Sequence, residues 1–238
     1  MNLKAWYLYN SGFAVDTGSH FLIFDYWVDS PKGAGLESGV ISLDEIRSKD
    51  VIVFCSHRHG DHYNPKIISW QRELPKLKII LSDDIPPAPG AVMIGKNQRI
   101  LLEGCAIETL ASTDEGVAFI VEIDGKRIYH AGDLNWWHWE GEPEQENADM
   151  AYNYKKQINL MAGKTLDLAF APVDPRLEAQ YNWGIDYLMR TVDVKKVIPM
   201  HFGDNPSIIG KLLSDPQTAQ YKARIAPLEK RGQSIELC

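Results

Sequence analysis

Apolar residues along the chain fall into short runs of strand length that polar turns separate. The first β-rich runs are broken at Ser11-Gly12 and again at residues 16–18, where Asp-Thr-Gly is typical of a hairpin turn. Residues 50–56 (DVIVFCS) form a continuous apolar run, the pattern of a strand covered on both faces. A further hairpin is predicted at Asp124-Gly125, between two more β-rich runs.

Helical signals alternate with these strands. Asn64-Pro65 is typical of a helix start, and residues 142–161 are acidic and rich in helix formers. Residues 166–175 (LDLAFAPVDP) predict a buried strand, and residues 181–192 predict a helix. Residues 195–206 (KKVIPMHFGDNP) then predict a strand that delivers His201 into a loop. This order of strands and helices predicts a layered α/β sandwich.

Composition narrows the class of protein. The 238 residues are 45% hydrophobic and 24% charged, which suits a single globular domain over residues 1–238. The net charge of −7 and the lack of a basic run argue against nucleic-acid binding and against attraction to anionic membranes. Three widely spaced cysteines argue against a disulfide framework. The sequence shows neither the pattern of a secretory leader nor eighteen consecutive apolar residues, so we expect a cytoplasmic protein. The oligomeric state stays open.

The segment HRHGDH, residues 57–62, contains three of the chain's seven histidines and an aspartate. In an extended exit from the preceding strand, His57 and His59 point to one side and can bind one ion. After the turn at Gly60, Asp61 and His62 can face a second ion. A lone histidine is more often a core or surface residue, but this crowding indicates a metal site because the protonated imidazoles would repel one another.

These residues resemble the His-x-His-x-Asp-His motif of the metallo-β-lactamase superfamily. The resemblance covers essentially the whole chain and implies a four-layered αββα sandwich of two similar halves, with a dinuclear metal site at one edge of the sheets. YHAGD resembles the segment that carries the superfamily's metal-bridging aspartate, here Asp133, and IPMHFG resembles its last histidine loop, here His201. Each alone could be a turn aspartate or a loop cap.

One position departs from the superfamily pattern. A histidine usually lies between the first motif and the bridging aspartate, but no histidine occurs between His62 and His130. The aligned segment LASTDEGVAF offers Asp114 or Glu115. We predict Asp114 as the third ligand of the His57/His59 ion, although residues 112–116 could be a simple turn. A carboxylate there would make Mn²⁺ or Fe²⁺ more competitive with the otherwise favoured Zn²⁺.

Chemistry and resemblance together imply metal-assisted hydrolysis, in which a hydroxide bridging two divalent ions attacks a small ester, phosphoester, lactone or amide. Asp61 is a candidate for orienting that hydroxide, and His138 for stabilising an oxyanion. His130 is predicted to be a hydrogen-bonding neighbour, and Asp25 to fix the tautomer of an imidazole.

Candidate substrate-pocket residues lie near the predicted strand ends: Tyr26, Trp136, Trp137, Asp174 and Arg176. The tryptophans could instead be core residues, and Arg176 could pair with a neighbouring acid rather than hold a carboxylate or phosphate. Within the superfamily, the chain looks closest to the branch of the L-ascorbate-6-phosphate lactonase and many uncharacterised hydrolases. The alternative, which the missing histidine keeps open, is a degenerate member that binds metal or regulates without hydrolysis.

Overall fold

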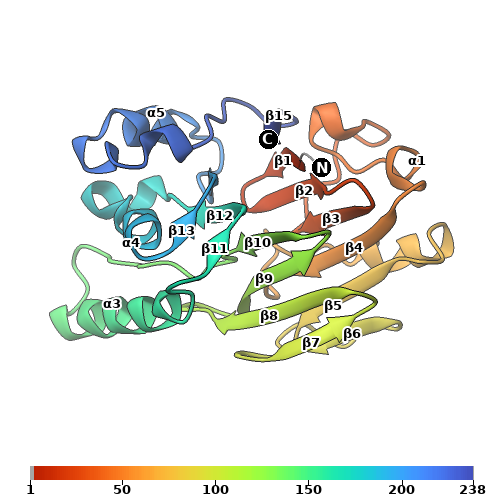
Figure 1. The fold of residues 1–238 in the computed structure, drawn as a ribbon, viewed down its shortest axis with the longest axis horizontal. Coiled ribbons are helices and arrows are strands. Elements are labelled where there is room, and N and C mark those ends of the chain that lie inside the picture. Colours follow the sequence, from red (N-terminus) through yellow and green to blue (C-terminus); the bar gives the residue numbers. More distant parts are fainter. Residues whose placement is uncertain (1–2, 238) are drawn as a thin grey trace.

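The computed structural model describes residues 3–237, so Cys238 lies outside the described residues. Two β-sheets form the centre of the molecule (Figure 1). The seven-stranded sheet has the order β15-β1-β2-β3-β4-β5-β6, and the six-stranded sheet has the order β14-β12-β10-β9-β8-β7. Their strands are β1 (Leu3–Tyr9), β2 (Gly12–Asp16), β3 (His20–Phe24), β4 (Asp50–Cys55), β5 (Lys78–Ser82), β6 (Ala91–Ile94), β7 (Arg99–Leu102), β8 (Cys105–Ala111), β9 (Val117–Ile123), β10 (Lys126–His130), β12 (Leu168–Pro172), β14 (Val197–Met200) and β15 (Ser234–Leu237). A separate pair joins β11 (Thr165–Leu166) to β13 (Asp193–Val194).

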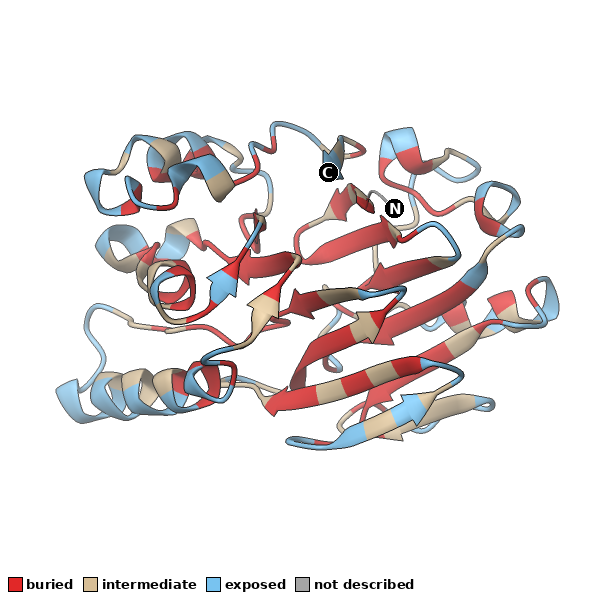
Figure 2. Cartoon of the chain, viewed as in Figure 1, coloured by how far each residue is buried: buried red, intermediate tan, exposed pale blue. Residues whose placement is uncertain are grey.

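Alternation along the strands builds the main core between the sheets. In β3, Leu22 and Phe24 belong to the core shared by both sheets, whereas Phe21 and Ile23 belong to an outer core of the seven-stranded sheet. Phe54 of β4 meets Phe119 of the opposite sheet with ring centroids 5.3 Å apart. The central strands are accordingly the most continuously buried part of the chain, whereas the edge strand β7 has no buried residue (Figure 2).

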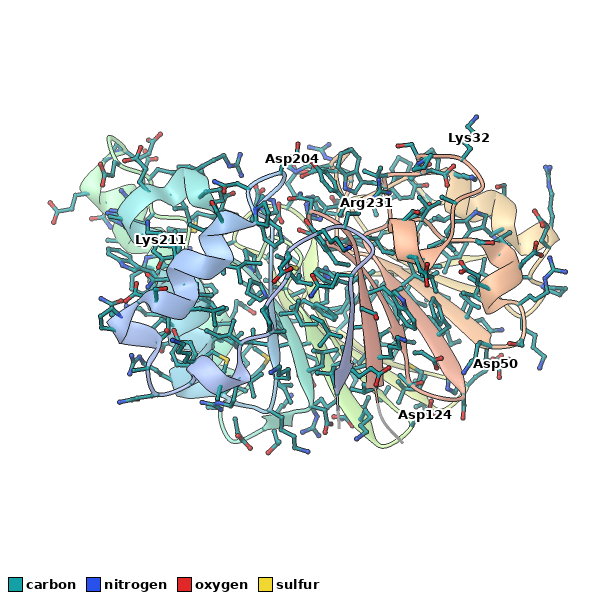
Figure 3. The ribbon with its side chains drawn as sticks, turned by 90° about the horizontal axis from the view of Figure 1, so that it is seen from above. Lys32, Asp50, Asp124, Asp204, Lys211 and Arg231 are labelled. Carbon is teal, nitrogen blue, oxygen red and sulfur yellow. The ribbon has the colours of Figure 1, made fainter. Side chains whose placement is uncertain are left out.

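Helices cover both outer faces. Against the seven-stranded sheet lie α1 (Leu43–Ile46) and α2 (Lys66–Ser69), whose Ile46 and Ile67 enter the outer core. Against the other sheet lie α3 (Glu144–Asn159), α4 (Trp183–Thr191) and α5 (Ser207–Ser214). Seen from above, helices flank the two sheets on either side (Figure 3). The predicted αββα sandwich is confirmed.

Local predictions mostly agree with the structure. Asp124 and Gly125, both with positive φ, form the turn between β9 and β10. The helix predicted after Asn64 is much shorter than its apolar pattern suggests, because α2 passes into a 3-10 turn at Trp70–Arg72. Asn64 still caps the segment, since its side-chain oxygen accepts a hydrogen bond from Lys66 N–H.

Over residues 3–237, no helix combines the length and apolar character needed to traverse a lipid bilayer.

Candidate metal centre

The predicted ligands follow strands that end at one edge of the two sheets. β3 and β4 are parallel, so Asp25 and the loop that begins at His57 leave neighbouring carboxyl ends. In the other sheet β10, β12 and β14 are parallel, and Asp133, Asp174 and His201 follow them. Carboxyl ends of parallel strands lie together, so residues far apart in sequence converge on one place.

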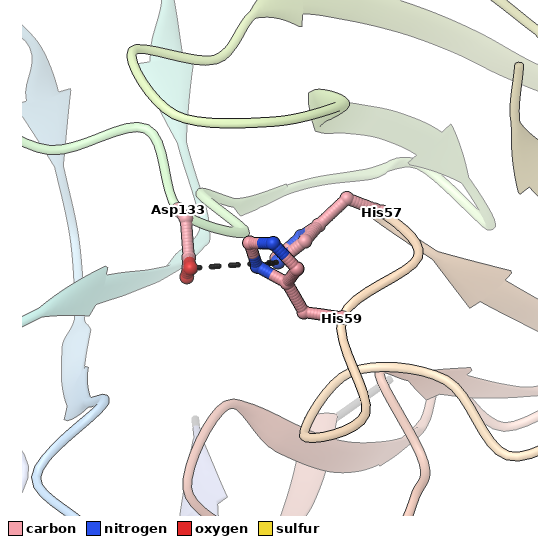
Figure 4. Close-up of side chains that lie close together, drawn as sticks. All are labelled: His57, His59 and Asp133. Carbon is pink, nitrogen blue, oxygen red and sulfur yellow. Dashed lines mark hydrogen bonds and ion pairs between the residues drawn. The ribbon is translucent and has the colours of Figure 1, made fainter. Parts of the chain in front are cut away.

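One cluster consists of His57, His59 and Asp133 (Figure 4). His57 Nε2 lies 3.1 Å from His59 Nδ1 and 3.5 Å from Asp133 Oδ2. A tetrahedral ion with bonds of about 2.0–2.1 Å holds its ligand atoms roughly 3.4 Å apart. The three side chains are therefore spaced like ligands of a single ion.

A second cluster consists of Asp61, His62 and His201. His62 Nε2 lies 3.5 Å from Asp61 Oδ2 and 3.3 Å from Asp133 Oδ1. His201 Nε2 also faces Asp133 Oδ1, at 3.4 Å. The two carboxylate oxygens of Asp133 thus face different clusters, as a carboxylate that bridges two ions would.

The other ring nitrogen of each clustered histidine has a partner in the protein. In the first cluster, His57 Nδ1 lies 2.9 Å from Ser56 Oγ, and His59 Nε2 lies 3.4 Å from Glu115 Oε2. In the second cluster, His62 Nδ1 lies 2.7 Å from Asp25 Oδ2, and His201 Nδ1 lies 3.0 Å from Asp174 Oδ2. Such contacts fix the tautomer and the ring orientation of metal-binding histidines. Each imidazole is held on one side and presents its free nitrogen to the centre.

Two buried atoms at this centre have no hydrogen-bond partner among the described residues: His62 Nε2 and Asp133 Oδ1. Buried polar atoms are seldom left unpaired, and an atom that is unpaired can mark the place of an ion. Four imidazoles with two carboxylates suit a divalent transition metal such as Zn²⁺, Mn²⁺ or Fe²⁺. The residues present therefore fit the metal ions that the sequence implies.

The electrostatics reflect this crowding. Burial disfavours charge on both His62 and His201, but neighbouring carboxylates outweigh it and raise the pKa of His62 well above normal and that of His201 to about 9. Burial would raise the pKa of Asp61, yet His62 lowers it to about 2. The pKa of Asp133 is lowered as well, by His62 and His201 against the effect of burial. The carboxylates are held ionised.

The segment that replaces the missing histidine lies beside the first cluster. Gly116, with φ of +66°, lets the turn pass so close that an added Cβ would lie 2.0 Å from Ser56 O. Asp114 is exposed and lines the adjoining pocket, but it is in neither cluster. Glu115 accepts two hydrogen bonds of 2.6 Å from Arg58. Asp114 as a third ligand therefore stays a prediction.

A pocket of about 420 Å³ opens in front of both clusters. Besides His59, Asp61, Asp133 and His201, its walls include Trp137, Trp139, Met150, Thr113, Asp114 and Arg176. Arg176 is bound to the buried Asp174 by its Nε and Nη2 atoms. Asp174 thus accepts hydrogen bonds from Arg176 and contacts the ring of His201. Arg176 is therefore paired with an acid, and it also lines the pocket.

Other candidates lie elsewhere. Trp136 and His138 line a separate pocket next to α3, where the His138 ring is 4.8 Å from that of Trp183. Tyr26 is buried in the outer core; its hydroxyl donates to Asp29 and accepts from Ile41 N–H. Neither Tyr26 nor His138 is among the residues that line the metal pocket, since Tyr26 packs in the outer core and His138 lines the other pocket.

Two residues that contact the candidate metal centre were not predicted from the sequence. Ser56 donates its backbone N–H and its hydroxyl to Asp25, both at 2.7 Å, while its oxygen also meets His57. Asn10, in the β1–β2 turn, donates to Asp61. Ser56 directly precedes the histidine motif and could have been suspected, but Asn10 carries no local signal because it reaches the site only through tertiary contacts.

The fold and the histidine-carboxylate clusters define an αββα sandwich protein with a metal centre at one edge of its sheets. No family model matches the chain. A UPF0173 metal-dependent hydrolase of Korarchaeum cryptofilum is 27% identical over 252 residues, covering 99% of this chain and 100% of that protein. Over its whole length the chain is therefore similar to a metal-dependent hydrolase, and it shares the fold of metallo-β-lactamase fold proteins.

Solved structures of other proteins share the fold of this chain. Igni18, a metallo hydrolase of Ignicoccus hospitalis, has a TM-score of 0.66 at 17% identity and covers 100% of this chain and 99% of its own. The metallo-β-lactamase fold protein YhfI of Bacillus subtilis has a TM-score of 0.59 at 11% identity, with 99% of each chain covered. At these identities the likeness establishes the fold.

Proposed function

We propose that this protein is a hydrolase that uses two divalent metal ions, one at His57, His59 and Asp133 and the other at Asp61, His62 and His201. The observation that carries the proposal is the position of Asp133, whose two oxygens face the two histidine clusters at 3.3–3.5 Å. The curated relatives are named metal-dependent hydrolases, which supports the same activity here.

Bound ions would act as Lewis acids and lower the pKa of a coordinated water toward neutrality. The chain's own part is to hold the reacting groups in place. Asp61 stays ionised at neutral pH because its pKa is about 2, and its side chain is 41% exposed to the pocket. It can therefore accept a hydrogen bond from the attacking water and orient it.

The pocket suits a small substrate. Its volume of about 420 Å³ and its two indole walls, Trp137 and Trp139, match a small organic molecule rather than a polymer. Arg176 Nη1 makes no hydrogen bond to the described residues and can bind a carboxylate or phosphate of the substrate. A small ester, phosphoester, lactone or amide fits this description, as in the lactonase-like branch.

The second candidate is a metal-binding or regulatory module without hydrolysis. What favours it is the incomplete first cluster, which has His57, His59 and Asp133 but no histidine at the superfamily's remaining position. Under this reading the ion at that cluster binds weakly, and Asp114 contributes nothing to its affinity.

The metal content of the protein distinguishes the dinuclear hydrolase from the non-hydrolytic module. Elemental mass spectrometry of purified wild type should find close to two ions per chain, and Asp114→Ala should lose about one if Asp114 is a ligand. Asp149→Ala, on the exposed face of α3, is the matched control and should keep both ions. One ion or none in wild type would contradict the dinuclear proposal and favour the module.

Hydrolysis is then tested with lactone, ester, phosphomonoester and phosphodiester substrates. Wild type loaded with Zn²⁺ or Mn²⁺ should turn over at least one class, while His62→Ala should turn over none. Wild type with two ions but no turnover beyond that of His62→Ala would argue for the non-hydrolytic module.

A further inference from the structure

Asn10, a residue that the proposed mechanism does not use, connects the two loops that carry the second cluster. It occupies the turn between β1 and β2 and is 8% exposed. Its side-chain Nδ2 donates to Asp61 Oδ2 at 3.0 Å. Its backbone oxygen accepts a hydrogen bond from His201 N–H at 3.2 Å. One residue thus contacts both Asp61 and His201, which lie 140 positions apart in the sequence.

The orientation of the Asn10 amide follows from its neighbours. Asp61 is an ionised carboxylate and can only accept, so the amide nitrogen must face it. Gly203 N–H can only donate, and it lies 3.3 Å from Asn10 Oδ1. Both ends of the amide are therefore satisfied in one orientation alone. An aspartate in its place would keep the acceptor for Gly203 but turn an oxygen toward Asp61.

The backbone of Asn10 is also constrained. Its φ is 52°, in the left-handed region, where asparagine is better tolerated than most residues. Tyr7 Oη accepts the Asn10 N–H at 2.9 Å and holds the turn from the strand side. The adjacent Ser11 O accepts a hydrogen bond from His130 Nε2 at 2.8 Å. The turn is therefore bonded to segments from both sheets and has little freedom to move.

We propose that Asn10 is a positioning residue that sets the spacing of Asp61 and His201, and thereby the affinity of the Asp61/His62/His201 cluster for its ion. This inference rests on the proposed metal function. Because Asn10 makes no contact with the His57/His59 cluster among the described hydrogen bonds, its loss should weaken one ion and spare the other. A residue needed only for folding would affect both ions together.

The test uses two variants of the full chain and a matched control. Asn10→Asp keeps the shape and the Gly203 contact but repels Asp61. Asn10→Gly keeps the left-handed backbone and removes both side-chain contacts. Asn97→Asp is the control, since Asn97 also has a positive φ, of 55°, and lies in the turn between β6 and β7.

Metal-free protein is titrated with Co²⁺, and two binding constants are taken from its visible absorption and from calorimetry. His59→Ala and His201→Ala identify which constant belongs to which cluster. Both Asn10 variants should weaken the constant that His201→Ala affects by about 10- to 100-fold, the usual effect of an outer contact, and leave the other within about twofold. Asn97→Asp should match wild type.

Two results would overturn the inference: unchanged constants in both Asn10 variants, or an equal weakening of both constants with a matching fall in the melting temperature. Wild type that binds no Co²⁺ would refute the proposed function and this inference together. Wild type with two ions and unaltered Asn10 variants would refute the inference alone.

Discussion

Replacing Asp25 with asparagine should weaken metal binding without disrupting the fold. Asp25 is completely buried and accepts three hydrogen bonds of 2.7 Å, from Ser56 N–H, Ser56 Oγ–H and His62 Nδ1–H. Burial alone would raise the pKa of Asp25, but His130 and His62 outweigh it and lower the pKa, so the carboxylate is ionised at neutral pH.

The magnitude follows from which of these bonds an amide can keep. In Asp25→Asn, the amide oxygen can still accept from Ser56 N–H and the amide nitrogen can donate to Ser56 Oγ. The His62 Nδ1–H would then face a donor and lose its partner. A hydrogen bond to a charged group contributes about 1.5–3 kcal/mol, so metal-free Asp25→Asn should lose about that much free energy of unfolding.

Metal affinity should fall as well, because His62 would no longer be held with Nε2 free for an ion. We expect a loss of about 10- to 100-fold at the second cluster, measured by calorimetric titration of metal-free protein with Zn²⁺. Urea unfolding of the same sample gives the stability.

Asp124→Asn is a close control, because Asp124 likewise accepts from a hydroxyl, Thr17 Oγ1–H, and contacts a histidine nitrogen, His20 Nδ1. It lies in the β9–β10 turn and should leave metal affinity unchanged. Equal Zn²⁺ affinity in wild type and Asp25→Asn would refute the role given to Asp25.

Four further predictions follow from the same geometry. Because metal-free His62 and His201 have raised pKa values, Zn²⁺ binding near pH 7 should release about two protons, seen as a buffer-dependent calorimetric enthalpy; equal enthalpies in all buffers would contradict this. Because the pKa of His201 is raised in the folded state, protonated His201 stabilises the metal-free fold below pH 6.5, and this contribution is lost as the pH rises through about 9. In urea unfolding of His201→Gln, this pH-dependent loss of stability should be absent. Gly116→Ala should destabilise the fold by more than about 1 kcal/mol, since its Cβ would overlap Ser56; a smaller change in urea unfolding would mean that the turn can move. Arg176→Gln should raise KM for an anionic substrate more than it lowers kcat, and an unchanged KM would argue against anion binding there.

The layered fold could be read from the sequence because its signals are local. The continuous apolar run of residues 50–56 predicts β4, and Asp124-Gly125 predicts the β9–β10 turn from conformational preference alone. The short α2 was not predicted, because where a helix ends after Asn64 depends on how residues 70–74 pack against the sheet. Packing overrides local preference there.

The sequence by itself identified the candidate ligands: His57, His59, Asp61 and His62 stand together in one motif, and the superfamily resemblance added Asp133 and His201. Only the tertiary structure decided what surrounds them. It brought Asn10 to Asp61 across 51 positions, held Glu115 against Arg58, packed Tyr26 into the outer core and placed His138 in a separate pocket. The physical reason is that ligand identity is a property of residue types at fixed spacing, whereas hydrogen-bond partners are set by side chains that meet only when the two sheets pack.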